Sequence, residues 1–118
     1  MVTCRQIVRR IALELNFSVI GHTMLVTAAS ELARNTLIHG GGGTFSWEVI
    51  GDGARRGLRL IFEDSGPGIP DVPRAMTNGW SSSKGLGLGL PGAKRLVHEF
   101  EIQSAPGRGT RIVIARWQ

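Results

Sequence analysis

Residues 57–70 read Gly-Leu-Arg-Leu-Ile-Phe-Glu-Asp-Ser-Gly-Pro-Gly-Ile-Pro. The apolar first half of this stretch predicts a buried strand, and its glycines and prolines predict a loop directly after Asp64. A carboxylate at a strand end can accept a hydrogen bond from an exocyclic amine, while glycines beside it let a flat ring lie against the main chain. The alternative for Asp64 is an ordinary Asp-Ser-Gly turn. The stretch therefore predicts both part of a sheet and a candidate ligand site.

Three further segments have strand patterns. Residues 44–50 alternate polar and apolar side chains, and the Gly-Asp-Gly turn that follows makes them the partner of residues 57–64 in a hairpin. Residues 101–104 and 110–117 are joined by a second glycine-rich turn. We therefore expect a mixed sheet that is mostly antiparallel.

Three segments have the periodicity of helices. In residues 4–15, apolar side chains recur every three or four positions, and residues 16–18 together with Gly21 are expected to end that helix. A second helix is predicted over residues 23–39 and a third over 90–100, which has a proline in its first turn where the missing N–H has no cost. The apolar side of the second helix is predicted to consist of Leu25, Ala28, Ala29, Leu32, Thr36 and Leu37.

The order of these elements predicts an α/β (α+β) two-layer sandwich, with the sheet covered on one face by about three helices. The 118 residues suit one domain, residues 1–118, without an internal repeat or linker. Residues 65–89 lack apolar periodicity, and a stretch of that length predicts a functional loop or lid.

Composition argues against several classes of function. The chain is 42% apolar and 19% charged, which is typical of a soluble globular domain, and no stretch approaches the ~20 apolar residues of a membrane span. The net charge is +5, but the 14 Lys and Arg are spread along the chain, and only 6% of residues are aromatic. Nucleic-acid binding is therefore not expected. We expect a cytoplasmic protein that does not bind membranes and is a monomer or weak dimer.

A run of alternating glycines, residues 85–90, leads into the predicted third helix. Such glycines let the main chain approach a phosphate with its N–H groups turned inward, and the helix dipole adds partial positive charge. The G-x-G-x-x-G at residues 87–92 does not fit a dinucleotide fingerprint, because no strand precedes it and no acidic residue follows ~20 positions later. The run is therefore either a phosphate cradle or a hinge that caps a helix.

Glu31 and Asn35 lie one turn apart on the second predicted helix, next to its apolar side. A half-buried carboxylate there can act as a base, and an amide oxygen suits a Mg²⁺ ion that phosphates also hold. The alternative is a polar pair on the surface without a chemical role.

In this order, four motifs resemble the boxes of the GHKL ATPases, which have the Bergerat fold: Glu31-x-x-x-Asn35, Asp64-x-Gly66-x-Gly68-Ile69, Gly85-x-Gly87-x-Gly89-Leu90 and Gly109-Thr110. Within that superfamily, the residues around the motifs are similar to the small anti-sigma-factor and stressosome serine/threonine switch kinases, the RsbT-like proteins. The resemblance covers nearly the whole chain from residue 5 onward.

The resemblance implies a role for each motif. Glu31 would be the general base for a protein hydroxyl, Asn35 would ligate Mg²⁺, and Asp64 would accept a hydrogen bond from the adenine amine. The remaining residues implied to bind ATP are Gly66, Gly68, Ile69 and Thr110 around the adenine, and Lys84, Gly85, Leu86, Gly87, Leu88, Gly89 and Leu90 around the phosphates. Residues 71–84 would form a lid over them.

The resemblance also implies a partner. The leading hypothesis is an ATP- and Mg²⁺-dependent protein serine/threonine kinase that phosphorylates a STAS-domain protein and so switches a stress or sigma-factor pathway. The alternative is a nucleotide-gated binding module that docks on and activates a PP2C-type phosphatase. One departure from the family is that this sequence starts almost at the first helix, whereas these kinases usually have a strand before it. That strand would lie at the sheet edge, so its loss should leave the ATP motifs intact.

Overall fold

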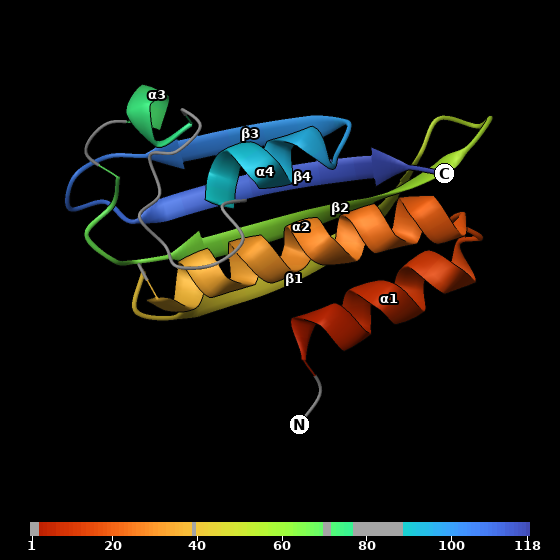
Figure 1. The fold of residues 1–118 in the computed structure, drawn as a ribbon, viewed down its shortest axis with the longest axis horizontal. Helices are drawn as coiled ribbons and strands as arrows, with labels where there is room; N and C mark the ends of the chain where they lie inside the picture. Colours follow the sequence, from red (N-terminus) through yellow and green to blue (C-terminus); the bar gives the residue numbers. More distant parts are fainter. Residues whose placement is uncertain (1–2, 39, 70–71, 77–88) are drawn as a thin grey trace.

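The computed structural model describes residues 3–38, 40–69, 72–76 and 89–118. Helices and strands in these ranges follow in the order α1 (Cys4–Glu14), α2 (Val19–Ile38), β1 (Gly43–Gly51), β2 (Arg56–Asp64), α3 (Val72–Ala75), α4 (Gly89–Arg95), β3 (Glu99–Ser104) and β4 (Thr110–Trp117). In Figure 1, α2 lies along β1 and β2, α4 lies along β3 and β4, and α1 lies beside α2 at the β1 edge. None of the helices within the described ranges is long and apolar enough to cross a membrane.

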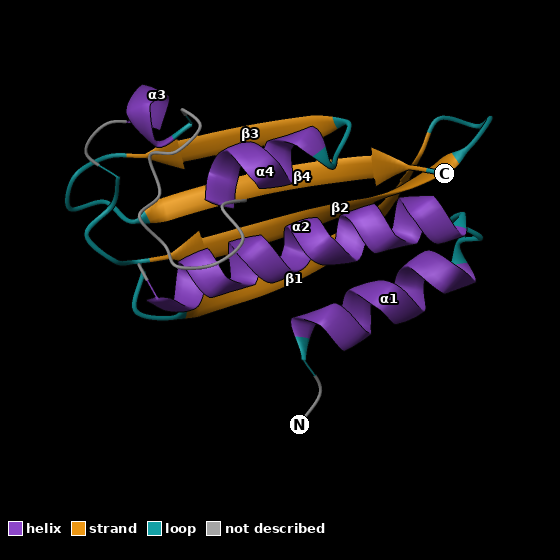
Figure 2. Cartoon of the chain, in the orientation of Figure 1, coloured by secondary structure: helices purple, strands orange, loops and turns teal. Residues whose placement is uncertain are grey.

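The sheet has the strand order β1-β2-β4-β3, and each neighbouring pair is antiparallel. Figure 2 shows the two layers, with the strands forming one and the larger helices the other. The α+β class predicted from the sequence is therefore confirmed, and the architecture is consistent with the Bergerat fold.

The first two helices differ from expectation at their junction. α1 begins at a capping box, in which Thr3 and Gln6 bond each other's backbone N–H groups. α2 starts at Val19 rather than at Thr23, because the hydroxyl of Ser18 accepts a hydrogen bond from the Gly21 N–H at 2.9 Å and so caps the helix. The expectation that Gly21 breaks the helix was wrong, since Gly21 lies buried inside it.

The structure differs from expectation in two places between β2 and β4. The predicted helix over 90–100 ends at Arg95, because the His98 N–H bonds the Ala115 carbonyl of β4 at 3.0 Å and the chain continues as a strand. Phe100 consequently lies in β3 opposite Ile114. The four-residue helix α3 falls inside the stretch that was expected to lack regular structure.

The core lies between the sheet and the helices. Phe62, Leu60 and Ile114 of the sheet and Leu25 and Leu32 of α2 are at most 2% exposed. The predicted apolar side of α2 is buried as expected except for Leu37, which is 69% exposed. Because this core fixes α2 against β2, it also fixes the polar residues at the ends of both elements.

Candidate active site

A row of four paired residues crosses the sheet at the end where α2 and β2 finish and β4 begins (Figure 1). The row consists of Gly43, Asp64, Thr110 and Ser104. Asp64 pairs with Gly43 on one side and with Thr110 on the other, and Thr110 pairs with Ser104. Directly paired residues point to the same face of a sheet, and Phe62, two residues before Asp64, points into the core beneath the helices. The row therefore faces the helix layer at the open end of the core.

The Asp64 carboxylate is fixed by the main chain around it. Its Oδ1 accepts a hydrogen bond from the Gly66 N–H at 2.9 Å. Its Oδ2 lies against Gly40, where an added Cβ would be 2.4 Å from that oxygen. Among the described residues no donor bonds Oδ2, so this oxygen can accept a hydrogen bond from a ligand.

Two loops hold each other closely beside this row. The Ile69 N–H donates to the Ser104 hydroxyl at 2.7 Å, and the Gly107 N–H donates to the Pro67 carbonyl at 2.7 Å. Gly68 has φ +79°, and a Cβ there would lie 2.0 Å from the Ala105 carbonyl, so only glycine fits. The loop after β2 is thus held against the turn before β4.

Glu31 and Asn35 lie one turn apart on α2 and are both half-buried. The Glu31 side chain is 15% exposed and is accompanied by Arg34, whose Nη1 lies 4.0 Å from Glu31 Oε1. The main-chain carbonyl of Asn35 accepts the Gly40 N–H at 3.2 Å, and Gly40 in turn packs against Asp64. The end of α2 that carries Asn35 therefore meets the end of β2 that carries Asp64.

The predicted phosphate-binding residues are described only in part. Gly89, with φ +50°, and the buried Leu90 form the start of α4. Lys84, Gly85, Leu86, Gly87 and Leu88 lie outside the described residues, as does most of the predicted lid.

Thr110 and Ser104 form a hydroxyl pair in the row. Thr110 is 7% exposed, and its Oγ1 lies 2.8 Å from Ser104 Oγ. The Ser104 hydroxyl also lies 2.9 Å from the Gly109 carbonyl, to which it can donate. Sequence reasoning missed Ser104, because a single serine at a strand end has no signal until the pairing of β3 with β4 is known.

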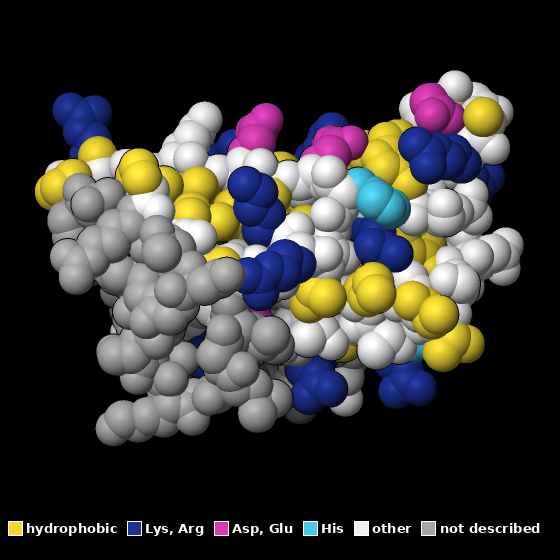
Figure 3. All heavy atoms as spheres, turned by 45° about the horizontal axis from the view of Figure 1, so that its top comes forward, with side chains coloured by type: hydrophobic (Ala, Val, Ile, Leu, Met, Phe, Trp, Pro, Cys, Tyr) yellow, Lys and Arg dark blue, Asp and Glu magenta, His cyan; other side chains and the backbone are white. Residues whose placement is uncertain are grey.

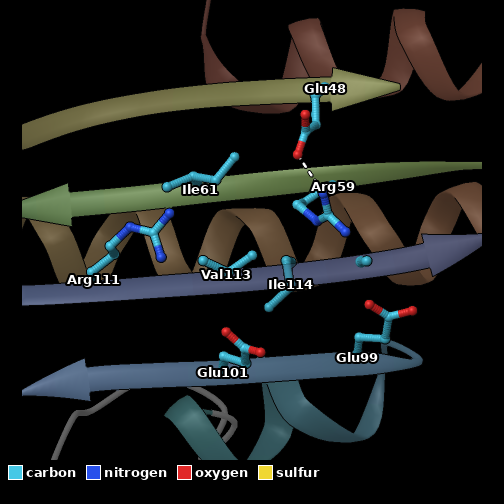
Figure 4. Close-up of a pocket in the computed structure, with 9 residues that line it drawn as sticks. Glu48, Arg59, Ile61, Glu99, Glu101, Arg111, Val113 and Ile114 are labelled. Carbon is cyan, nitrogen blue, oxygen red and sulfur yellow. Dashed lines mark hydrogen bonds and ion pairs between the residues drawn. The ribbon is translucent and has the colours of Figure 1, made fainter. Parts of the chain in front are cut away.

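Among the described residues, one hollow at the sheet is lined by Asp64, Thr110 and Ser104 of the row, and another lies elsewhere on the sheet. A hollow of about 400 Å³ is lined by Asp64, Ser104, Gly109 and Thr110 together with Arg108 and Arg111. The other, about 280 Å³, lies on the face of the sheet away from the helices, where Glu48 and Arg59 point toward one another as an ion pair (Figure 4). That second hollow contains none of the residues predicted to bind a ligand.

Basic side chains are spread over the displayed face of the molecule. In Figure 3, Lys and Arg side chains appear at several separate places on the displayed face, some of them next to Asp or Glu. Within the described ranges no three His, Cys, Asp or Glu side chains come together as metal ligands.

Residues 21–118 match the family model of the histidine kinase-, DNA gyrase B- and HSP90-like ATPases. The chain therefore belongs to this ATPase family, and an ATPase domain of this kind implies ATP binding.

Within this family, the chain is similar to a serine/threonine kinase and to anti-sigma F factors. The chain is 45% identical over 117 residues to the serine/threonine-protein kinase RsbT of Bacillus subtilis (strain 168), an alignment that covers 99% of this chain and 88% of that protein. It is 31% identical over 103 residues to the anti-sigma F factor of Clostridium novyi (strain NT), covering 80% of this chain and 69% of the relative. The anti-sigma F factor of Thermoanaerobacter sp. (strain X514) is 26% identical over 119 residues, covering 96% and 82%. The chain is thus an RsbT-like serine/threonine kinase homologue.

Proposed function

We propose that this RsbT-like kinase transfers the terminal phosphoryl group of ATP to a serine or threonine of a STAS-domain partner, and thereby switches a stress or sigma-factor pathway. The observation that carries the proposal is the meeting of two predicted motifs at one end of the sheet. Gly40 joins them, because its N–H is hydrogen-bonded to the main-chain carbonyl of Asn35 and its Cα is packed against Asp64.

The adenine would bind at the row that crosses the sheet. Asp64 Oδ2 is suited to accept the exocyclic amine, since Oδ1 is already bonded to the Gly66 N–H. Gly66, Gly68 and Ile69 would line one side of the ring and Thr110 the other. Within the described residues, Asp64 Oδ2 is thus the acceptor that we assign to the adenine amine.

The phosphates would lie toward α2 and the start of α4. Asn35 would ligate Mg²⁺ through its amide oxygen, together with the phosphate oxygens, which is the coordination that this hard cation prefers. Gly89 and Leu90, with the glycine run before them, would cradle the phosphates. When bound, Mg·ATP supplies the phosphoryl group and offsets the charge that develops during its transfer.

Glu31 would be the general base. Its carboxylate lies one turn before Asn35 and is only 15% exposed, so it is near the metal ligand yet still accessible to a substrate hydroxyl. In this role Glu31 accepts the proton of the attacking serine or threonine and orients its oxygen toward the phosphoryl group.

A protein partner is supported by the surface next to the site. Leu37 and Ile38, in the last turn of α2 beyond Asn35, are 69% and 63% exposed. Exposed apolar side chains that cluster beside a site are typical of surfaces that bind other proteins. We infer the STAS-domain identity of the partner, in a stressosome or anti-sigma-factor system, from the resemblance of the sequence motifs to the RsbT-like switch kinases.

The experiment combines the purified chain, γ-labelled ATP and a STAS-domain protein from the same organism, with the phosphorylated residue found by mass spectrometry. We expect Mg²⁺-dependent transfer to one Ser or Thr, abolished when that residue is changed to Ala. If the ATP-bound chain transfers no phosphate but activates a PP2C-type phosphatase, the binding-module alternative replaces the kinase proposal.

A further inference from the structure

We propose that Arg34, Leu37 and Ile38 form the acceptor-recognition surface of this kinase. The segment that this surface binds has an acidic side chain next to the phosphorylated Ser or Thr and an apolar side chain about three positions away. The inference rests on the proposed function, because it assigns a substrate class to the same site. The three residues lie in the last two turns of α2.

Their side chains share the exposed side of the helix. Successive residues of an α-helix are about 100° apart, so residues three and four positions apart are neighbours on its surface. Leu37 and Ile38 follow Arg34 by three and four positions and therefore flank it. The Arg34 side chain is 51% exposed, and the two apolar residues are exposed to a similar extent. Leu32 and Thr36, on the opposite side of the helix, are buried.

The Arg34 guanidinium has hydrogen-bond donors to offer a ligand. Arginine carries several N–H donors and no acceptor. Within the described residues its ion pair joins Nη1 to Glu31 Oε1 at 4.0 Å, which is longer than a hydrogen bond. None of the donors is therefore bonded to another described residue. A carboxylate can bind two of them at once, which is the geometry in which arginine binds acids most strongly.

The acceptor-recognition surface is continuous with the proposed general base. Glu31 precedes Arg34 by one turn and lies at the margin between the exposed and buried sides of α2. Asn35 lies at the same margin, since it follows Glu31 by one turn. In Figure 1 this end of α2 lies where β2 finishes. A hydroxyl that reaches Glu31 therefore brings its neighbouring residues over Arg34 and Ile38.

Distances along the helix set the spacing within the acceptor. Each helical residue rises by about 1.5 Å, so Arg34 is ~4.5 Å and Ile38 ~10.5 Å beyond Glu31. A segment bound in extended form along α2 advances by about 3.3 Å per residue. An acidic side chain about one or two positions from the hydroxyl reaches Arg34, and an apolar side chain about three positions away reaches Ile38.

The two ends of α2 provide an internal comparison. Ile20 in the first turn is 66% exposed, close to the 63% of Ile38 in the last turn. Arg34, however, is the only Lys or Arg of this helix, so a cation beside exposed apolar side chains occurs only at the end that carries Glu31. Arginine is enriched in surfaces that bind proteins, and apolar side chains are buried at their centres. The combination therefore indicates a protein segment as the occupant.

The first test measures phosphate transfer from ATP to the STAS-domain protein, with its KM and kcat determined separately, for Arg34→Ala and Ile38→Ala. The matched controls are Ile20→Ala and Arg56→Ala, an exposed arginine at the start of β2. We expect each test variant to raise the KM for the partner about tenfold, the scale of one charge-assisted hydrogen bond or of a partly buried apolar side chain. The controls should leave this KM unchanged, and kcat and Mg·ATP affinity should change far less than KM in all variants.

A charge exchange tests the chemistry of the acceptor. Mass spectrometry of the phosphorylated partner should place an Asp or Glu within about two positions of the modified Ser or Thr. Replacing that acid with Lys should raise the KM. Arg34→Glu should then restore transfer to the altered partner while it impairs transfer to the unaltered one. A phosphorylated residue without a neighbouring acid, or a charge exchange that restores nothing, overturns the inference.

The remaining outcomes separate this inference from the proposal on which it rests. A lower kcat at unchanged KM for Arg34→Ala would mean that Arg34 acts only through Glu31, and a loss of Mg·ATP affinity would make it a nucleotide ligand. Either result overturns the inference while the kinase proposal stands. If the wild-type chain binds Mg·ATP but transfers no phosphate to the partner, the proposed function is wrong and the acceptor-recognition surface falls with it. Thermal melting checks folding, which substitutions at exposed side chains should leave intact.

Discussion

Replacing Gly40 with alanine should weaken ATP binding by displacing the Asp64 carboxylate. A Cβ at Gly40 would lie 2.3 Å from Asp64 Cγ and 2.4 Å from its Oδ2, whereas Cβ contacts under 3.0 Å are essentially never seen. The carboxylate cannot simply turn away, because its Oδ1 is bonded to the Gly66 N–H. The new methyl group therefore moves the oxygen that we assign to the adenine amine.

The size of the effect follows from the bond that is lost. A hydrogen bond to a charged group contributes about 1.5–3 kcal/mol, which corresponds to a loss of ATP affinity of about 10- to 150-fold. The backbone of Gly40 is not in the left-handed region, so alanine itself introduces no strain there. Gly51→Ala is the matched control, because its nearest contact is an ordinary 3.6 Å from the Arg55 carbonyl.

Calorimetric titration with a non-hydrolysable ATP analogue measures this loss directly, with thermal melting as the check on folding. Asp64→Asn should also bind poorly, because an asparagine that keeps the bond to Gly66 turns its NH₂ toward the adenine amine. The double variant Gly40→Ala/Asp64→Asn should then be no worse than Asp64→Asn alone, since both changes act on one group. Unchanged affinity of Gly40→Ala, or full additivity in the double variant, would refute the reasoning.

Three further properties can be predicted from the described structure. Leu60→Ala, at a side chain with 0% exposure, should lower the free energy of unfolding by about 2–5 kcal/mol in urea titrations, whereas Leu13→Ala, 49% exposed, should change it far less. Burial, with Arg116 nearby, lowers the pKa of His98 from 6.5, and its Nδ1 accepts the Trp117 N–H at 3.0 Å. The unfolded chain therefore binds this proton more readily, so stability should fall as the pH drops below 6.5, and an equal slope in His98→Gln would contradict this. Burial raises the pKa of the Cys4 thiol to about 11, so the native protein should react with a disulfide reagent at pH 8 much more slowly than the urea-unfolded chain, and equal rates would show that the thiol is not protected.

The sequence was sufficient for the parts of the site that depend on local spacing. Glu31 and Asn35 are one helical turn apart wherever their helix lies, and Asp64 ends a strand whose apolar pattern is unambiguous. The sheet class likewise follows from period-two patterns and glycine turns. These signals lie within a few residues of each other, so they can be recognised without knowing the fold.

Features that depend on distant partners could not be predicted in this way. Ser104 becomes significant only when β3 and β4 pair and the loop with Ile69 returns beside them. The end of α4 is set by the bond from the His98 N–H to Ala115, seventeen positions along the chain. The early start of α2 could have been predicted from the sequence, because Ser18 is a good capping residue. The nearby Gly21 indicated a break in the helix instead.

In the proposed mechanism Glu31 acts in the chemistry, and Asn35 acts in holding Mg·ATP. Glu31→Gln keeps the size and hydrogen bonding of the side chain while it removes the basicity. The decisive measurement is the single-turnover rate of phosphate transfer to the STAS-domain partner, taken together with Mg·ATP affinity, for Glu31→Gln and Asn35→Ala. We predict that Glu31→Gln binds Mg·ATP within a few-fold of wild type yet transfers about 10²-fold more slowly or worse, and that Asn35→Ala loses Mg·ATP binding itself. Transfer at the wild-type rate by Glu31→Gln, or undiminished Mg·ATP binding by Asn35→Ala, would contradict the account.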